Sequence, residues 1–264
     1  MSTVSALPLK PTGASRPFTD IGAMVGRETR RLLRSVDALV TALAIPVSIM
    51  LVFVVVFGGA IAQDGRYINY VVPGVLVLCT GFGSAATAIS VAQDRHSGTF
   101  DRFKTMPIFG PAVLFGHVVA SVARNLVSSA VVFGVALLLG FRPDADFGHL
   151  VLATLYLAFL IVAFTWLSCA AGLLLSVDAA GSLNFVFLFL PYVSSGFVAT
   201  GTMPGWLQGF AEYQPFTPII ETLRSLLTGS PLGWHGWAAV LWLAGIGLAG
   251  LVAATVLYRR QTAR

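Results

Sequence analysis

The chain has 264 residues, of which 56% are hydrophobic and only 10% are charged, and its mean hydropathy is +0.85. Soluble domains carry about a quarter charged residues, so this composition excludes a water-soluble fold and indicates that lipid surrounds much of the protein. The net charge of +5 comes from basic residues that gather near the two ends and in one loop, which is typical of membrane topology and not of nucleic-acid binding.

The N-terminal segment is polar and basic. Residues 1–16 are predicted to be disordered. From residue 17 to residue 36 the apolar positions follow helical spacing, and the same segment holds Arg27, Arg30, Arg31 and Arg34. We expect residues 17–36 to form an amphipathic helix in the membrane interface, with its arginines near lipid phosphates. The alternative is a basic linker that only sets the topology.

Long uncharged runs locate the membrane spans. A bilayer core requires about 20 residues of apolar helix, and the runs predict six spans, at about 37–60, 68–92, 115–140, 149–175, 180–199 and 235–258. Only helices and closed barrels cross a bilayer, and no stretch alternates with period two, so the predicted fold class is an all-α integral membrane protein with one membrane domain, 17–264. Arginine and lysine concentrate on the side of both termini, which predicts a multi-pass protein of the cell membrane with cytoplasmic termini.

Two features inside the predicted spans leave alternatives open. Arg124 is the one ionisable residue expected within a helix, either as a functional group or as a side chain that reaches back to the interface. The small residues between Gly81 and Ala85 permit close approach of helices, either between two copies of the chain or within one.

The segment after residue 178 is too long for one span. Residues 179–211 hold 33 uncharged positions, about 50 Å of helix against a core of about 30 Å. Pro204 and its neighbouring glycines predict a break. Two short helices that re-enter the outer leaflet are expected within residues 200–229. This candidate re-entrant gate includes Pro204, Trp206, Pro215, Glu221 and Arg224.

The sequence offers no chemistry of its own. The two lysines, Lys10 and Lys104, follow Leu9 and Phe103, so no Gly-Lys-Ser/Thr phosphate-binding loop exists and the chain is not expected to hydrolyse ATP. No metal site is expected, because His96 alone of the four histidines has a possible partner at ligand spacing, Asp94, and two ligands do not make a site. All four histidines are expected to be interfacial or solvated. The alternative from another class, an ion-coupled carrier or membrane enzyme, is disfavoured because no carboxylate lies in the middle of a span.

Residues 93–108 read QDRHSGTFDRFKTMPI, and this pattern resembles the coupling segment of type 2 ATP-binding-cassette (ABC) exporter permeases. Four later pieces also look like that family: Ser194 to Phe197, Met203 to Gln208, Gln214 to Pro218, where Gln214 replaces the usual Asn, and Glu221 to Arg224. The daunorubicin-resistance-like branch of drug exporters has the most similar pattern.

The resemblance implies a subunit that lacks an ATPase site and works with a separate ABC ATPase, which binds the ATP and magnesium. Two permease copies, expected to be a homodimer, would export hydrophobic drugs or lipid-like molecules by alternating access. A lipid-linked cell-surface polysaccharide or teichoic-acid-type glycan is the alternative cargo. The coupling loop is residues 93–111, with the ATPase-coupling residues Asp94, Arg95, Gly98, Thr99, Asp101, Arg102 and Phe103.

The resemblance also implies a substrate path, because spans two and five line the dimer interface in this family. Aromatic and hydroxyl side chains on these spans suit an amphipathic, flat cargo. The candidates are Thr80, Phe82, Ser84 and Thr87 on span two and Asn184, Phe185, Phe189 and Ser194 on span five.

Overall fold

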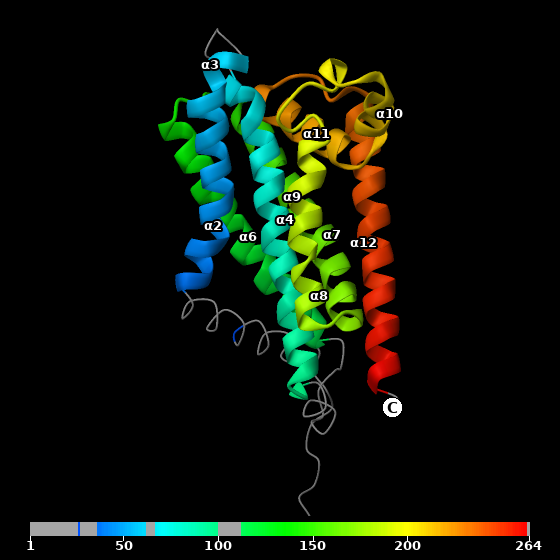
Figure 1. Cartoon of the computed structure of the whole chain (residues 1–264). Coiled ribbons are helices and arrows are strands. Elements are labelled where there is room, and N and C mark those ends of the chain that lie inside the picture. The colour runs from blue at the N-terminus through cyan, green and yellow to red at the C-terminus, as the bar shows by residue number, and fades with distance from the viewer. Residues whose placement is uncertain (1–25, 27–35, 62–66, 100–111, 263–264) are drawn as a thin grey trace, which may run out of the picture.

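The computed structural model describes residue 26 and residues 36–61, 67–99 and 112–262. These residues form helices joined by turns, with no strand among them, and the long helices run side by side as one bundle (Figure 1). The predicted all-α class is confirmed. The predicted disordered segment and the four arginines of the interfacial helix lie outside the described residues, as do Asp101, Arg102 and Phe103 of the coupling loop.

Five helical segments are long and apolar enough to cross a membrane within the described part of the chain. Their bounds agree with five predicted spans to within a few residues. The first span is continuous through three pieces, of which the middle one is a π-helix that the sequence did not predict. The helices are α2 (Val36–Leu51), η1 (Val52–Phe57) and α3 (Gly58–Ile61) in the first span, then α4 (Tyr67–His96), α6 (Ala112–Leu138), α7 (Phe147–Leu174) and α12 (Gly233–Thr262).

The predicted span 180–199 differs from the structure, which has two shorter helices here, α8 (Val177–Gly181) and α9 (Leu183–Tyr192). The helix ends early because the following turn packs against α4 by backbone contact. A Cβ atom added to Gly74 of α4 would lie 2.5 Å from the carbonyl oxygen of Gly196. Ser194 holds the turn by donating a 2.6 Å hydrogen bond to the carbonyl of Pro191.

Two short helices follow after the 3₁₀ turn η2 (Thr200–Thr202): α10 (Gly205–Tyr213) and α11 (Phe216–Thr228). Their presence agrees with the prediction, and their re-entry into the outer leaflet stays a prediction. Both lie at the upper end of the bundle in Figure 1. α11 packs against α4, α7, α9 and α12, and Ile219, Ile220 and Leu223 on it are fully buried. α11 is therefore part of the protein core at this end, whereas α10 lies outside it.

α4 is the central helix of the bundle, and its glycines allow this. A Cβ at Gly81 would lie 2.9 Å from the side chain of Phe187 on α9, and one at Gly83 would lie 1.7 Å from Asn125 Oδ1 on α6. The small residues between Gly81 and Ala85 thus serve packing within one chain, which decides the alternative left open by the sequence at these two glycines.

Candidate functional site

The lower end of the bundle in Figure 1 carries the start of the predicted coupling loop. α4 ends at His96, after which the amide of Ser97 donates to the carbonyl of Gln93 at 2.9 Å. Gly98 has a φ of +67°, a left-handed conformation that glycine adopts without strain, and its amide donates to the carbonyl of Arg95 at 3.3 Å. Gly98 therefore turns the chain out of the helix within the predicted coupling loop.

Asp94 and Arg95, just before this turn, point into the bundle. Asp94 Oδ2 lies 3.2 Å from Nε2 of His117 on α6, and both side chains are buried. Arg95 donates to the carbonyls of Leu173 and, at 2.9 Å, Leu175, at the carboxyl end of α7. Carbonyls there lack helical partners and attract a cation. The expectation of an interfacial or solvated histidine is wrong for His117, because the fold supplies a buried carboxylate that the sequence pattern did not reveal.

A fourth helix joins the same cluster. Gln261, in the last turn of α12, donates to the carbonyl of Leu173 at 2.7 Å. The ends of α4, α6, α7 and α12 are thus tied together where the coupling loop leaves α4. The ATPase-coupling role of Asp94, Arg95, Gly98 and Thr99 stays a prediction, and within the chain the first two act as tethers.

A buried polar seam runs between α4, α6 and α7. Thr87 on α4 donates to Ser121 on α6 at 3.1 Å, and Ser121 lies 3.0 Å from Thr165 on α7. Arg124 donates to the carbonyl of Gly83 at 2.8 Å and to Thr87 Oγ1 at 2.9 Å. The polar seam consists of Ser84, Thr87, Ser121, Arg124, Asn125 and Thr165.

The seam changes the interpretation of Arg124 and of span two. Arg124 bonds to α4 within the bundle. Of the predicted path residues, Ser84 and Thr87 belong to the seam, and Thr80 is fully buried with its hydroxyl on the carbonyl of Val77. Their hydroxyls are used inside this chain. Sequence reasoning missed Ser121 and Asn125, although His117, Ser121, Arg124 and Asn125 share one face of α6 at helical spacing.

The predicted path residues on α9 divide into two groups. Phe185 and Phe189 are 62% and 60% exposed and lie on the same side of the helix. Ser194 is fully buried in the turn after α9, and Asn184 is half-buried. Phe82 on α4 is likewise half-buried against the core. The structure therefore does not bring the eight predicted residues together on one surface.

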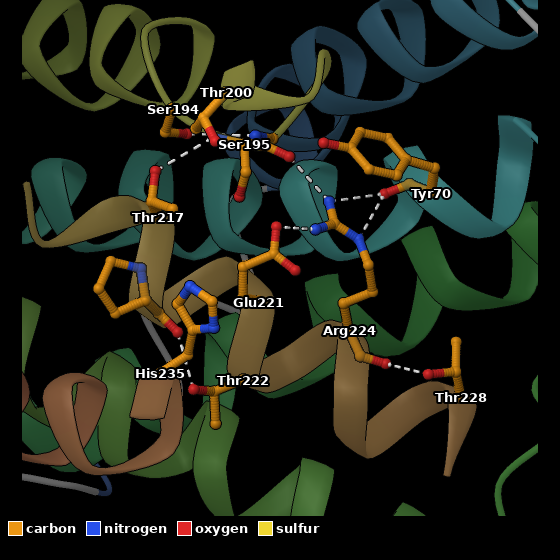
Figure 2. A network of polar contacts seen from close by, with 12 residues as sticks. Tyr70, Ser194, Ser195, Thr200, Thr217, Glu221, Thr222, Arg224, Thr228 and His235 are labelled. Carbon is orange, nitrogen blue, oxygen red and sulfur yellow. Dashed lines mark hydrogen bonds and ion pairs between the residues drawn. The ribbon is translucent and has the colours of Figure 1, made fainter. Parts of the chain in front are cut away.

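At the opposite end of the bundle, Arg224 of α11 holds three segments together (Figure 2). It donates to the carbonyl of Tyr70 on α4 through Nη2 at 3.0 Å and to the carbonyl of Ser195 at 2.8 Å, and Nη1 pairs with Glu221 Oε1. Its guanidinium carbon lies 3.9 Å from the ring centroid of Tyr70, a cation–π distance. The amide of Ser195 donates to Thr217 Oγ1 at 3.2 Å.

The predicted gate residues therefore fall into two groups, one in the packed α11 region and one exposed at α10. Glu221 and Arg224 meet as predicted from their i, i+3 spacing, and Pro215 precedes the first residue of α11. Pro204 and Trp206 lie on the exposed side of α10. Tyr70 and Ser195 were missed because Tyr70 is 154 residues from Arg224 and both contribute backbone carbonyls, which no sequence motif marks.

Among the described residues, no group of three or more His, Cys, Asp or Glu side chains is placed to hold a metal ion. The polar groups that the fold gathers are hydroxyls, amides, backbone carbonyls and paired charges. Such groups tie helices together.

Comparison with known proteins gives a consistent result. The family model described as ABC-2 type transporter matches residues 19–228. A daunorubicin resistance ABC transporter permease protein, DrrB1, of Streptomyces coeruleorubidus is 33% identical over 228 residues, which are 85% of this chain and 81% of that protein. A probable doxorubicin resistance ABC transporter permease protein, DrrC, of Mycobacterium tuberculosis is 25% identical over 258 residues, 89% of this chain and 88% of that one. A putative transport permease of Cyanophora paradoxa is 26% identical over 172 residues, 63% of this chain and 58% of that one.

Proposed function

Because this chain belongs to the ABC-2 type transporter family, we propose that it is the membrane subunit of an ATP-driven drug exporter. A separate ABC ATPase binds ATP and magnesium and supplies the energy. The cargo is a hydrophobic drug or lipid-like molecule. The observation that carries this proposal is the match to daunorubicin and doxorubicin resistance permeases over most of both chains.

The contacts at the end of α4, where the coupling loop begins, support the proposal that an ATPase acts on the bundle from outside. Motion of a docked loop reaches the spanning helices only if the loop is rigidly connected to them. Asp94 connects the end of α4 to α6 through His117, and Arg95 connects it to α7. A displacement of the chain where it leaves α4, at residues 97–99, is therefore proposed to move three helices together. Asp101, Arg102 and Phe103, together with Gly98 and Thr99, are proposed to meet the ATPase.

The topology of the proposed subunit has six crossings. Besides the five long spans, one further crossing, the fifth along the chain, is formed by α8 and α9, whose residues 177–192 are apolar but fewer than in those spans. At 1.5 Å per residue they cover about 24 Å, and the packed turn that follows continues to the α11 end. Six crossings place both termini on one side, and the positive-inside rule makes that side cytoplasmic. The proposed location is the cell membrane.

A second copy of the chain completes the proposed transport path. The outward Phe185 and Phe189 on α9 offer aromatic surface to a flat apolar cargo or to the partner copy. Most of α4 is buried within its own chain, so its hydroxyls contribute less to the path than α9 does. We therefore propose that α9 forms most of the path through Phe185 and Phe189. The half-buried Asn184 and Phe82 contribute less.

The experiment that tests this function is co-purification with an ABC ATPase encoded beside the gene, followed by transport. Wild-type chain is expected to bring down the ATPase and, in drug-sensitive cells, to lower daunorubicin accumulation. Deletion of residues 97–102 is expected to abolish both. Gly98→Pro and Asp101→Arg are expected to leave the protein in the membrane but abolish substrate-stimulated ATPase activity.

The outcomes distinguish the assignment of the coupling loop from the exporter function itself. Gly245→Ala, on the far helix α12 in open space, is expected to retain coupling. Normal coupling in both Gly98→Pro and Asp101→Arg would contradict the assignment of the coupling loop. Failure of wild-type chain to associate with any ATPase would contradict the exporter function itself.

A further inference from the structure

The α10 end of the bundle exposes several large aromatic side chains. α10 has nine residues, and its aromatic side chains all lie on one side of the helix. Trp206 is 82% exposed, Tyr213 71% and Phe210 57%. Spacings of i, i+4 and i+7 put these three side chains on a single face.

The opposite face of α10 is fixed to the protein. Ala211 is fully buried, and Glu212 accepts a 2.7 Å hydrogen bond from Thr200. The other carboxylate oxygen of Glu212 lies 3.7 Å from His235 Nε2 in the first turns of α12. The helix is therefore held with Ala211 and Glu212 toward the protein and its aromatic face outward.

The aromatic face continues onto α12. The ring centroids of Tyr213 and Trp234 lie 6.0 Å apart, and Trp237, one turn further along α12, is 78% exposed. These side chains form one uncharged aromatic patch: Trp206, Phe210, Tyr213, Trp234 and Trp237.

Below the patch, α12 presents an exposed apolar stripe, and Tyr258, the aromatic residue of α12 beyond Trp242, is buried. Leu241, Leu248 and Val252 are 72%, 61% and 58% exposed and follow Trp237 on the same side of the helix. In a multi-pass membrane protein such a stripe faces the acyl chains. Tryptophan and tyrosine concentrate where acyl chains meet headgroups, because their rings are apolar and their N–H or O–H groups are polar.

We infer that α10 lies in the headgroup–acyl interface of the leaflet at its end of the bundle, with the aromatic patch in contact with phospholipid. The occupant of the patch is lipid and not a second copy, because the patch is continuous with the lipid-facing stripe of α12. α10 is thus a surface anchor, whereas the buried α11 packs inside the protein. Glu212 attaches α10 to η2 through Thr200 and to α12 through His235.

Depth-dependent quenching of tryptophan fluorescence tests the inference. The chain has five tryptophans, and four of them are replaced by phenylalanine to leave a single reporter at Trp206, Trp237, Trp242 or Trp166. The full-length variants are reconstituted in phosphatidylcholine vesicles, with bromine placed either near the headgroup end of the acyl chains or near their terminal methyl groups.

Trp206 and Trp237 are expected to lose more emission with bromine near the headgroup than with bromine near the methyl end. Trp242 lies five residues further along α12, about 8 Å deeper, and its preference is expected to shift toward the deeper bromine. Trp166 is 6% exposed and serves as the matched control, with little quenching in either lipid.

Three results would overturn the inference. Insensitivity of Trp206 to both lipids with strong quenching by acrylamide in the water would place the patch in solvent. Insensitivity to lipid and to acrylamide would mean that a second copy or another protein covers it. Stronger quenching of Trp206 by the deeper bromine would mean that α10 inserts into the leaflet and does not lie at its surface.

Discussion

Two helices of this protein have the same length, but one lies at the centre of the bundle and the other at its edge. α4 and α12 each contain 30 residues and are apolar enough to span a membrane, yet 78% of the spanning part of α4 is buried against 17% for α12. α4 has close-packed glycines and hydroxyls that bond to its neighbours. α12 has bulky aliphatic and aromatic side chains that face outward. Lipid solvates an apolar helix as well as protein does, so small residues and polar contacts, and not hydropathy, select the central helix.

The largest expected effect is loss of the tether that holds α4 to α11. Arg224→Leu leaves Glu221 and the carbonyls of Tyr70 and Ser195 without their partner. Removing one partner of a fully buried ion pair costs about 3–5 kcal/mol. The Arg224–Glu221 pair is only partly buried, so a loss at the lower end of that range is expected, measured as a lower unfolding temperature of the detergent-purified protein. Arg142→Leu is the control, because Arg142 is exposed and its guanidinium donates to the nearby carbonyls of Leu137 and Phe141. Equal losses in both variants would contradict the tether.

A matched pair of leucines tests the contrast between the two helices directly. Leu76 on α4 is 1% exposed and Leu241 on α12 is 72% exposed. Leu76→Ala leaves a cavity, for which soluble proteins lose about 2–5 kcal/mol. In lipid the lower end of that range is expected, because the transfer of the side chain from water no longer contributes. Leu241→Ala is expected to change stability by less than about 0.5 kcal/mol. Thermal unfolding in detergent measures both, and a larger loss at Leu241 would reverse the comparison.

A pair of glycines tests the close approach of α4 to the turn after α9. Gly74→Ala forces a methyl group to within 2.5 Å of the Gly196 carbonyl, so backbone must move. Overpacking of this kind costs about 1–3 kcal/mol. Gly245 on α12 has open space around it, and Gly245→Ala is expected to stabilise the helix by up to about 1 kcal/mol. Unfolding temperatures that move in the same direction for both variants would contradict the contact.

The smallest expected effect concerns the polar seam. Thr87→Val removes the hydroxyl that donates to Ser121 and accepts from Arg124. Interhelical hydrogen bonds in membranes contribute about 0.6 kcal/mol on average, and at most about 1.7 kcal/mol. Thr255→Val on α12 is the control, because that hydroxyl bonds to the carbonyls of its own helix. A loss at Thr255 equal to that at Thr87 would mean that the seam adds nothing to stability.

Part of the candidate site could be predicted from consecutive residues. Glu221 and Arg224 meet because their spacing fixes them on one face of a helix. Gly98 terminates α4 because only glycine adopts its conformation without strain. The exposed and buried members of the predicted path could not be separated, because Thr80, Ser84 and Thr87 on α4 and Phe185 and Phe189 on α9 have similar local patterns. His117 was misassigned since its partner Asp94 lies on another helix.

By itself the sequence determined the all-helical fold, the position of five long helices and the two short helices α10 and α11. These features follow from local hydrogen bonding and from the length of apolar runs, which consecutive residues specify. Only the tertiary structure decided that α4 is central, that α9 ends at Tyr192, and that Arg224 joins segments distant in the sequence. The reason is that an apolar side chain has nearly the same free energy against lipid as against protein, so the choice of neighbours depends on close packing and on polar contacts between remote residues.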